Sequence, residues 1–476
     1  MATFLLEIGT EELPADFSRQ VISQLKEKAL SDLDQMRVIH GNCLCSSTPR
    51  RIFLLIENLP DKAKDYVEER KGPSALQAFK NGSPTQAAIG FAKSCGINSD
   101  QLEVRETKKG SFVFAKILEK GKPVNELLIS LIPKWIGELH GTRFMRWSSG
   151  ERRFSRPVRW IVSLLDEKLI PIALGGCNPE VISNNRTRGH RLFQDSVTIN
   201  SASEYLPTLE RFGVQVDRIK RQKLIINLIN SASKEYKSFP ELPQDLLEEL
   251  TDLVETPSLI CGKFDNHFLN LPPEVLTIVM RSHQRYIPLY LSEKSILDPL
   301  SFQSKDILNT SFLCISNGLT TSSNTVVLGN ERVLRARLSD AKFFVESDLA
   351  QSSESRCELL KKVTFAEGLG SLFDRVKRIE WIVEILLKEI HIQSINQNNL
   401  LNAARLCKHD LVSQMVGEFP ELEGIIGGKY LLKEGKPREI ALAVLEHYLP
   451  RFAGDSLPTS SSGAILALAE RFELLI

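Results

Sequence analysis

Two hydrophobic periodicities run along the chain, one typical of mixed α and β structure and the other of helices. Phe4–Ile8 and Arg51–Ile56 are apolar runs of strand length, and residues 16–33 between them have the spacing of an amphipathic helix. A second helix is predicted at 124–139. Lys109-Gly110, which lies between Val104 and the apolar run Phe112–Ala115, predicts a hairpin turn. The N-terminal part is therefore expected to combine helices with paired strands.

The middle of the chain continues this mixture. From Lys71 the sequence is rich in Gly, Pro and Ser, which predicts short helices packed between loops. Two apolar runs separated by the charged segment Asp166–Lys168 predict another hairpin, and 218–236 and 242–254 have helical patterns. The polar segment Thr320–Asn324 is expected to be a loop that ends this region.

Beyond residue 330 nearly all of the pattern is helical. Apolar residues step by three or four from Leu372 to Ile390, and further helices are predicted at about 400–417, at 437–448 and from Ser462. The chain stops on the apolar run Phe472–Ile476, which has no cap and no polar tail, so we expect a truncation.

These patterns predict an α+β multidomain protein, with mixed α/β N-terminal domains followed by an all-helical domain. We expect boundaries at 1–140 for an N-terminal α+β domain, 141–325 for a second α+β domain that holds arginine-rich segments, and 326–476 for the helical domain.

Composition narrows the class of protein. The 60 Lys+Arg and 59 Asp+Glu residues leave a net charge of +1, which argues against coating nucleic acid by bulk charge but permits a local basic patch. No stretch approaches the roughly 20 apolar residues of a membrane span. The N-terminus lacks the basic leader of a signal peptide, and the 8 cysteines form no CxxC pair. We expect a cytoplasmic protein without membrane contact.

The sharpest local feature is an arginine-rich segment interleaved with aromatic residues. Six arginines fall within the 17 residues from Arg143 to Arg159, and a second cluster is Arg186–Arg191. Guanidinium groups suit phosphate oxygens, and both guanidinium planes and aromatic rings stack on bases. The alternative is a solvated face with internal arginine–carboxylate pairs, and the sequence leaves the choice between the two open.

Two further segments leave the choice between chemistry and structure open. Gly329–Asp340 begins a helix on which Arg332 and Arg335 are neighbours, and Glu331 is placed to pair with Arg335. The pattern fits a helix that contacts a nucleic acid and a salt-bridged structural helix equally well.

His409-Asp410 is predicted to lie within a helix, and such a pair ligates metal in phosphohydrolases of the His-Asp (HD) class. Arg378 stands where the upstream histidine would be expected, and the downstream acid could only be Glu470 or Glu473. Because so few possible ligands converge here, the pattern favours a histidine that binds no metal.

Signatures of independent catalysis are absent from the sequence. Gly424–Lys429 breaks the phosphate-loop pattern, and no H-E-x-x-H, G-x-S-x-G or G-x-G-x-x-G motif occurs. The HIGH and KMSKS signatures of class I synthetases are also missing. We therefore predict no catalytic residue in this chain.

Taken together and in order, several segments resemble the β subunit of the bacterial two-subunit glycyl-tRNA synthetase over essentially the whole chain. No single segment is specific by itself, and the resemblance depends on their joint occurrence. They are Leu5–Pro14, Met145-Arg146-Trp147, Arg156–Trp160, Arg186–Arg191, Gly329–Asp340, Phe343-Phe344, Glu418–Leu422 and His447-Tyr448.

The resemblance implies a division of labour. In that family the α subunit carries the active site that uses ATP and Mg²⁺, and the β subunit holds tRNA(Gly) in a heterotetramer of two α and two β subunits. It implies N-terminal domains partly similar to those of the phenylalanyl-tRNA synthetase β chain, a degenerate HD-like helical domain without metal, and a C-terminal anticodon-binding region that this chain lacks. No cofactor is expected in this chain itself.

Arginines in the matching segments are the expected tRNA contacts, because cationic contacts to phosphate set orientation. Arg156 and Arg159 are expected to be structural. Two alternatives remain: a metal-dependent HD-type nucleotide phosphohydrolase, and a non-enzymatic RNA-binding module. The predicted tRNA-binding residues are Arg143, Arg146, Arg152, Arg153, Arg188, Arg191, Arg332 and Arg335.

Overall fold

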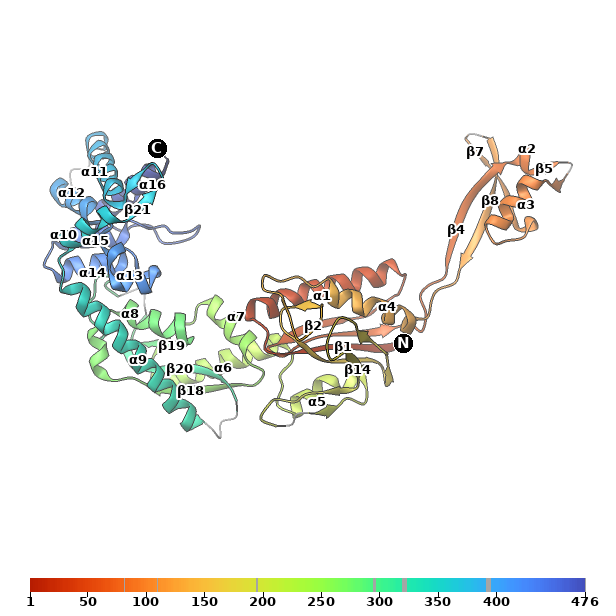
Figure 1. The fold of residues 1–476 in the computed structure, drawn as a ribbon, viewed down its shortest axis with the longest axis horizontal. Coiled ribbons are helices and arrows are strands. Elements are labelled where there is room, and N and C mark those ends of the chain that lie inside the picture. Colours follow the sequence, from red (N-terminus) through yellow and green to blue (C-terminus); the bar gives the residue numbers. More distant parts are fainter. Residues whose placement is uncertain are drawn as a thin grey trace. The chain divides into compact units, whose positions relative to one another are not determined.

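The computed structural model describes residues 1–80, 82–108, 110–193, 196–293, 297–318, 323–390 and 395–475. They divide into two compact units. Unit 1 comprises Met1–Gln222 and Thr251–Thr256, and unit 2 comprises Lys223–Leu250 and Pro257–Ile476. The chain therefore passes between the units three times, and Figure 1 follows it by colour. The fold is α+β and multidomain with a helical C-terminal region, as the sequence predicts.

Unit 1 is built on a seven-stranded mixed sheet. Its central strand β1 pairs antiparallel with β3 on one side and with β11 on the other, so residues on both sides of position 140 share one sheet. β11 pairs in parallel with β14. The order β13-β14-β11-β1-β3-β2, with β12 paired to β11, uses β1 (Ala2–Thr10), β2 (Cys43–Thr48), β3 (Arg51–Leu59), β11 (Val158–Leu165), β12 (Lys168–Leu169), β13 (Ala173–Leu174) and β14 (Val181–Asn184).

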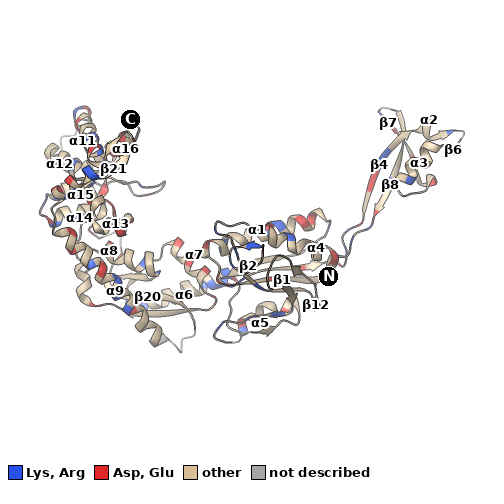
Figure 2. Ribbon diagram, viewed as in Figure 1, with Lys and Arg blue, Asp and Glu red and all other residues tan. Residues whose placement is uncertain are grey.

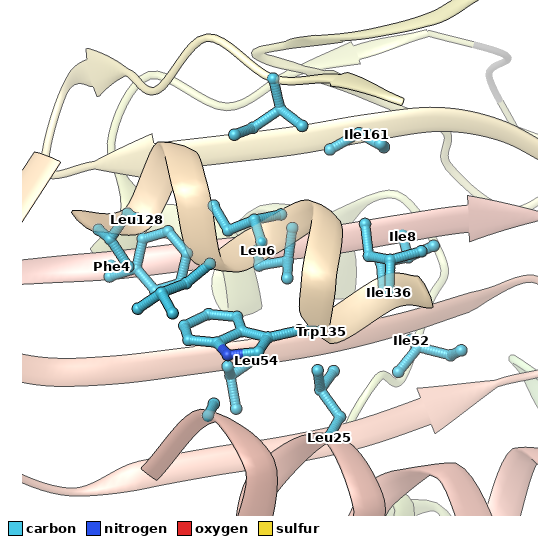
Figure 3. Packing of buried hydrophobic residues seen from close by; sticks show 14 of the residues in the cluster. Phe4, Leu6, Ile8, Leu25, Ile52, Leu54, Leu128, Trp135, Ile136 and Ile161 are labelled. Carbon is cyan, nitrogen blue, oxygen red and sulfur yellow. The ribbon is translucent and has the colours of Figure 1, made fainter. Parts of the chain in front are cut away.

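Two helices cover one face of this sheet. Because side chains alternate along a strand, Phe4, Leu6 and Ile8 of β1 point to the same face, where they pack against α1 (Ala15–Gln35) and α4 (Val124–Gly137). Figure 3 shows Trp135 of α4 beside Phe4 and Leu54 in this core. The indole nitrogen of Trp135 donates to Asp32 of α1 at 2.9 Å, which ties the two helices together.

The opposite face of the same sheet is also buried. Leu5 of β1 and Trp160 of β11 pack there against α5 (Tyr205–Arg211). A sheet covered on both faces needs apolar side chains at successive positions, which explains why β1 is a continuous apolar run. Glu7 is the charged exception within that run, and it is fully buried.

Residues 66–119 form a small sheet with its own core. Antiparallel strands in the order β4-β8-β7 are β4 (Tyr66–Ser74), β8 (Gly110–Glu119) and β7 (Glu103–Thr107), with α2 (Ala75–Ala78) and α3 (Gln86–Ser94). The β7–β8 hairpin and the short helices confirm the prediction, although Lys109 lies outside the described residues. The loop expected at Lys71 is wrong, because Lys71 continues β4 and pairs with Phe114 of β8.

Unit 2 begins with a four-stranded antiparallel sheet in the order β17-β19-β20-β18. Its strands are β17 (Phe239–Pro240), β18 (Pro257–Lys263), β19 (Ile287–Tyr290) and β20 (Leu308–Asn317). The predicted helices at 218–236 and 242–254 are confirmed as α6 (Arg218–Tyr236) and α7 (Gln244–Leu253).

The long helix α9 (Ser323–Leu349) packs Leu334, Leu338 and Ala341 into the core beside this sheet. It begins six residues before Gly329, where the sequence pattern places its start. Residues 320–322 of the predicted loop at Thr320–Asn324 lie outside the described residues, whereas Ser323 and Asn324 belong to the helix. The loop prediction is therefore wrong at these two positions, where the low helix propensity of Ser and Asn is overridden in the fold.

The rest of unit 2 is helical apart from a short hairpin, β21 (Thr364–Ala366) with β22 (Gly370–Ser371). Predicted helices at 372–390, at 437–448 and from Ser462 are confirmed as α11, α15 and α16. The full set is α10 (Ser353–Leu359), α11 (Leu372–Glu389), α12 (Gln397–Leu406), α13 (Gln414–Glu418), α14 (Ile425–Lys433), α15 (Arg438–Glu446) and α16 (Ser461–Leu475).

The single helix predicted at about 400–417 is wrong. It is divided into α12, a 3-10 turn at His409–Val412, and α13. The side chain of Ser413 caps the start of α13 by accepting from the amide of Val416 at 3.1 Å, which favours a new helix start there. His409 and Asp410 consequently lie in a short 3-10 turn and not in an α-helix.

Acidic and basic residues are interleaved along the elements of both units, as Figure 2 shows. Within the described ranges, no helix combines the length and the apolar character that a membrane span requires.

Candidate nucleic-acid interface

A buried charged centre lies on the α5 side of the sheet in unit 1. The guanidinium of Arg51 is fully buried and donates to the carboxylates of Glu7 at 3.2 Å and of Glu255 at 3.0 Å. It also donates to the hydroxyl of Thr187 at 3.2 Å and to the carbonyl oxygen of Arg188 at 2.8 Å. Burial raises the pKa of Glu7, whereas the pKa of Glu255 is lowered because attraction to Arg51 and bonded donors outweigh its burial. The centre therefore fixes the backbone of the Arg186–Arg191 segment.

Trp160 connects this centre to the surface. Its indole nitrogen donates to Glu7 at 3.0 Å, and its ring lies on Gly9, where an added Cβ would come within 1.8 Å of a ring atom. Glycine is required at that position because of this close approach. The guanidinium of Arg188 lies over the same ring, with its central carbon 4.7 Å from the ring centroid. The guanidinium carbon of Arg50 lies 6.0 Å from that centroid.

A cationic groove opens beside Trp160. We call it the Trp160 groove; its volume is about 420 Å³, and the residues that the structure describes in its lining carry no carboxylate. Burial lowers the pKa of Arg50, and the like charges of Arg51, Arg188 and Arg191 lower it further, against the attraction of Glu255. Positive charge is therefore concentrated here. The lining residues are Trp160, Asn184, Arg186, Thr187, Arg188 and Ser196.

A second basic surface is the hairpin β9 (Met145–Arg146) and β10 (Arg153–Phe154). Arg146 lies directly opposite Arg153 in its antiparallel register, and both are exposed. Like charges at directly opposed positions repel each other, so an anion between them would be favourable. Phe154 anchors the hairpin, because its ring packs 5.6 Å from that of Phe17 in the core.

The eight arginines predicted to bind tRNA fall into three groups in the structure. Arg143, Arg146 and Arg153 in unit 1 and Arg332 in unit 2 are exposed, and within the described parts of the chain none pairs with a carboxylate. Arg152 and Arg188 are half-buried, and Arg152 donates to the carbonyl of Gly175 at 2.8 Å. The remaining two form exposed ion pairs at 3.0 Å, Arg191 with Glu12 and Arg335 with Asp265.

The predicted pairing of Glu331 with Arg335 is wrong. Glu331 instead accepts from the backbone amide of Lys263 at 2.8 Å, and Asp265 takes its place as the partner of Arg335. The two arginines expected to be structural have different surroundings. Arg159 is exposed and pairs with Glu11 at 2.6 Å, whereas Arg156 is half-buried and donates to the carbonyl of Ser155.

Several residues of this surface are not predicted from the sequence. Arg50 and Arg186 are not among the expected tRNA-binding residues, although Arg186 belongs to the second arginine cluster and Arg50 directly precedes a predicted strand. The buried centre is not predicted either. Its one visible signal is Glu7, a charged residue inside an apolar strand, because buried carboxylates require a partner.

The turn that holds His409 and Asp410 is a buried hydrogen-bonded structure. Nδ1 of His409 accepts from Arg356 at 3.1 Å, and Nε2 donates to the carbonyl of Gly427 at 3.1 Å, a tautomer assigned from these partners. Burial and the charge of Arg356 lower the pKa of His409 to about 3. Oδ2 of Asp410 accepts from the amides of Gly424 and Gly427, and burial raises its pKa to about 6.

The acids considered as a downstream metal ligand are already engaged with cations. Glu470 accepts from Lys408 at 2.7 Å and from Arg375 at 2.8 Å, and Glu473 accepts from Arg375 at 2.7 Å and from Arg378 at 2.9 Å. We call these five residues the Lys408 centre. Among the residues that the structure describes, no group of three or more His, Cys, Asp or Glu side chains is arranged to hold a metal ion.

Lys408 is fully buried and lies 3.0 Å from Nε2 of His447. Burial and the charge of Lys408 hold the pKa of His447 well below its usual range, so that ring is neutral. The ammonium group thus provides the positive charge that these buried acceptors require.

Known proteins of one family match nearly the whole length of this chain. The profile of the glycyl-tRNA synthetase beta subunit family matches residues 4–476. The chain is 43% identical over 477 residues to the glycine–tRNA ligase beta subunit of Trichodesmium erythraeum (strain IMS101), covering 100% of the chain and 65% of that protein. The corresponding protein of Acaryochloris marina (strain MBIC 11017) is 44% identical, with 100% and 65% covered. The chain therefore spans about two thirds of the length of these curated relatives.

Proposed function

This chain belongs to the glycyl-tRNA synthetase beta subunit family, and from that premise we propose that it binds tRNA(Gly) and positions it for glycylation by a partner α subunit. The reaction converts ATP, glycine and tRNA to glycyl-tRNA, AMP and diphosphate, with ATP and Mg²⁺ used by the α subunit. The assembly is a heterotetramer of two α and two β subunits in the cytoplasm.

The observation that carries the proposal is the pair Arg146 and Arg153, which are both exposed, lie opposite each other on one hairpin and form no ion pair with any carboxylate that the structure describes. Phosphate is the anion that such a pair suits best, because the guanidinium fork matches its oxygens. Exposed Arg143 precedes the same hairpin. Arginines of this kind set the register of an RNA without reading its sequence, which is what a positioning subunit requires.

A salt titration tests the assignment of these arginines to phosphates. Replacing Arg143, Arg146 or Arg153 by Gln should weaken binding of cognate and non-cognate tRNA alike, and should reduce the slope of log K against log salt by roughly one for each phosphate that is no longer neutralised. Melting should be unchanged, since such exposed substitutions stay within about 0.5 kcal/mol. Arg159→Gln is the matched control, because Arg159 is exposed but paired with Glu11. An unchanged slope in all three variants would contradict the assignment.

The chain is proposed to be non-catalytic by itself. The support is that both ring nitrogens of His409 are hydrogen-bonded and that buried Lys408 is bonded to Glu470, so neither side chain is free to act on a substrate. The purified chain should give no glycine-dependent pyrophosphate exchange, and addition of a cognate α subunit should restore glycylation. Exchange by the chain alone would overturn this proposal, and failure to support glycylation would favour an RNA-binding module without an α partner.

The phosphohydrolase alternative makes a different prediction. It requires manganese, iron or zinc in stoichiometric amount, lost in a His409→Ala variant. We propose instead that the purified chain contains no such metal, because a metal on His409 would displace Arg356 or Gly427 from the ring.

A further inference from the structure

The Trp160 groove differs from the hairpin surface in shape and in chemistry. Its volume of about 420 Å³ lies in the range of about 300–1,000 Å³ typical of small-ligand sites, which is too small for an RNA duplex. Of the six lining residues that the structure describes, two are arginines and none is acidic. An anionic ligand of the size of one nucleotide satisfies both conditions.

The groove presents one guanidinium in a fixed orientation. Arg188 lies over Trp160, and its carbonyl oxygen is held by Arg51 at 2.8 Å. Among the described residues Arg188 forms no ion pair with a carboxylate. A planar cation held in this way is suited to stack on a base, because unpaired bases in protein–RNA complexes stack on aromatic rings and on arginine planes.

The other lining residues can bind a phosphate and the edge of a base. Arg186 is exposed, and its backbone amide donates to Oδ1 of Asn184 at 2.7 Å. That bond fixes the carboxamide of Asn184 and leaves its nitrogen as a hydrogen-bond donor to a base edge. The hydroxyl of Thr187 is already used, since it donates to Glu7 at 2.7 Å.

We propose that the Trp160 groove binds a single unpaired nucleotide, with its phosphate on Arg186 and its base against the guanidinium plane of Arg188. This inference rests on the proposed function, because it specifies the part of the RNA that this surface receives. The hairpin with Arg146 and Arg153 binds backbone phosphates, whereas the groove takes one base out of the stack.

The test uses the complete chain and three fluorescent RNA probes: a single-stranded tetranucleotide, its abasic analogue and a blunt duplex. Arg188→Lys keeps the charge and removes the plane. It should weaken binding of the tetranucleotide about tenfold, and it should change binding of the abasic analogue and the duplex less than twofold. Arg159→Lys is the matched control, because Arg159 is exposed and lies one residue from Trp160 on β11. Equal weakening of the tetranucleotide and the abasic analogue, or no change in either, would overturn the proposal.

A second variant tests the proposal independently of any structural role of Arg188. Arg186→Gln should weaken the tetranucleotide and the abasic analogue to the same degree, without lowering the melting temperature, because it removes the cation that binds the phosphate. Unchanged binding of both probes would overturn the proposal even if Arg188→Lys destabilises the fold.

The outcomes separate this inference from the proposed function. If Arg188→Lys leaves tetranucleotide binding intact while substitution of Arg146 or Arg153 still weakens tRNA binding, the groove assignment fails and the proposed function stands. If the groove variants behave as expected but the chain with its α subunit does not glycylate tRNA, the groove stands and the proposed function fails.

Discussion

In unit 1 one buried cation, Arg51, joins two carboxylates, whereas in unit 2 two carboxylates, Glu470 and Glu473, receive three cations. The first centre holds Trp160 and the backbone of Arg188, and so it supports an exposed cationic groove. The second centre joins α11 to α16 around Lys408, with Arg375 and Arg378 on one helix and Glu470 and Glu473 on the other. The two networks therefore differ in what they hold: the first fixes residues that line a surface groove, whereas the second ties two helices together.

The largest effect is expected from removing the shared cation of unit 1. Arg51→Met leaves Glu7 and Glu255 buried without their common partner, so the free energy of unfolding should fall by about 3–5 kcal/mol in urea titrations. Glu7→Gln is the matched variant, because it keeps an acceptor for Arg51, Thr187 and Trp160. Burial already raises the pKa of Glu7, so this variant should cost about 1 kcal/mol or less. Equal costs would show that charge is not what holds this centre.

A smaller loss is expected in unit 2. Lys408→Met preserves most of the side-chain volume, and Glu470 retains Arg375 as a partner, so the free energy of unfolding should fall by about 2–3 kcal/mol. Lys377→Met, at an exposed lysine whose partner Glu380 keeps Arg405, should change it by less than about 1 kcal/mol. A Lys408→Met chain as stable as the parent would mean that the Lys408 centre does not depend on its ammonium group.

Two adjacent residues should contribute to the pH dependence of stability with opposite signs. The pKa of Asp410 is raised to about 6 in the fold, so its proton stabilises the native state at acid pH, and this contribution is lost as pH rises through about 6. The pKa of His409 is lowered to about 3, so its contribution is present above the unfolded pKa of about 6.5 and is lost as pH falls toward 3. The two contributions oppose each other between about pH 4 and 6.

Asp410→Asn removes one of these opposing contributions. The gain in unfolding free energy from pH 5 to pH 7 should therefore become larger by roughly 1 kcal/mol than in the parent chain. Urea titrations at pH 5, 6 and 7 measure this difference, which is independent of any constant cost of the substitution. A gain that shrinks would reverse the assigned direction for Asp410.

The smallest effects are expected on α9, where the two readings of its arginines can be compared directly. Arg335→Ala breaks an exposed pair with Asp265 and should cost less than about 1 kcal/mol, and Arg332→Ala should stay within about 0.5 kcal/mol. If α9 binds tRNA, Arg332→Ala should reduce the salt slope of binding by about one. If the salt slope fell for Arg335→Ala and not for Arg332→Ala, Arg335 and not Arg332 would be the residue that contacts phosphate.

Local periodicity predicted most elements, since the apolar spacing of β1, β3 and α11 is readable from each segment alone. Strand β4 was not predicted, because its pairing with β8 overrides the turn-forming Gly and Pro near Lys71. The turn at His409 was not predicted, because its partners, Arg356 and Gly427, are distant in sequence.

The clustering of arginines from Arg143 to Arg159 is visible in the sequence, but the hairpin that carries some of them and the partners of individual arginines are not. Arg51 and Glu255 are 204 residues apart, and no local pattern connects them. The same limit applies to Arg335, whose acidic neighbour in sequence is not its partner in space.

The three crossings of the chain between its units have a consequence for how related genes can exchange parts. A single crossover after codon 222 would transfer most of unit 1 but leave behind codons 251–256, which belong to it. That hexapeptide carries Glu255, so the incoming Arg51 would meet whatever residue the recipient supplies at that position. Recombinants that keep the two pieces together should therefore fold better than those that separate Arg51 from Glu255.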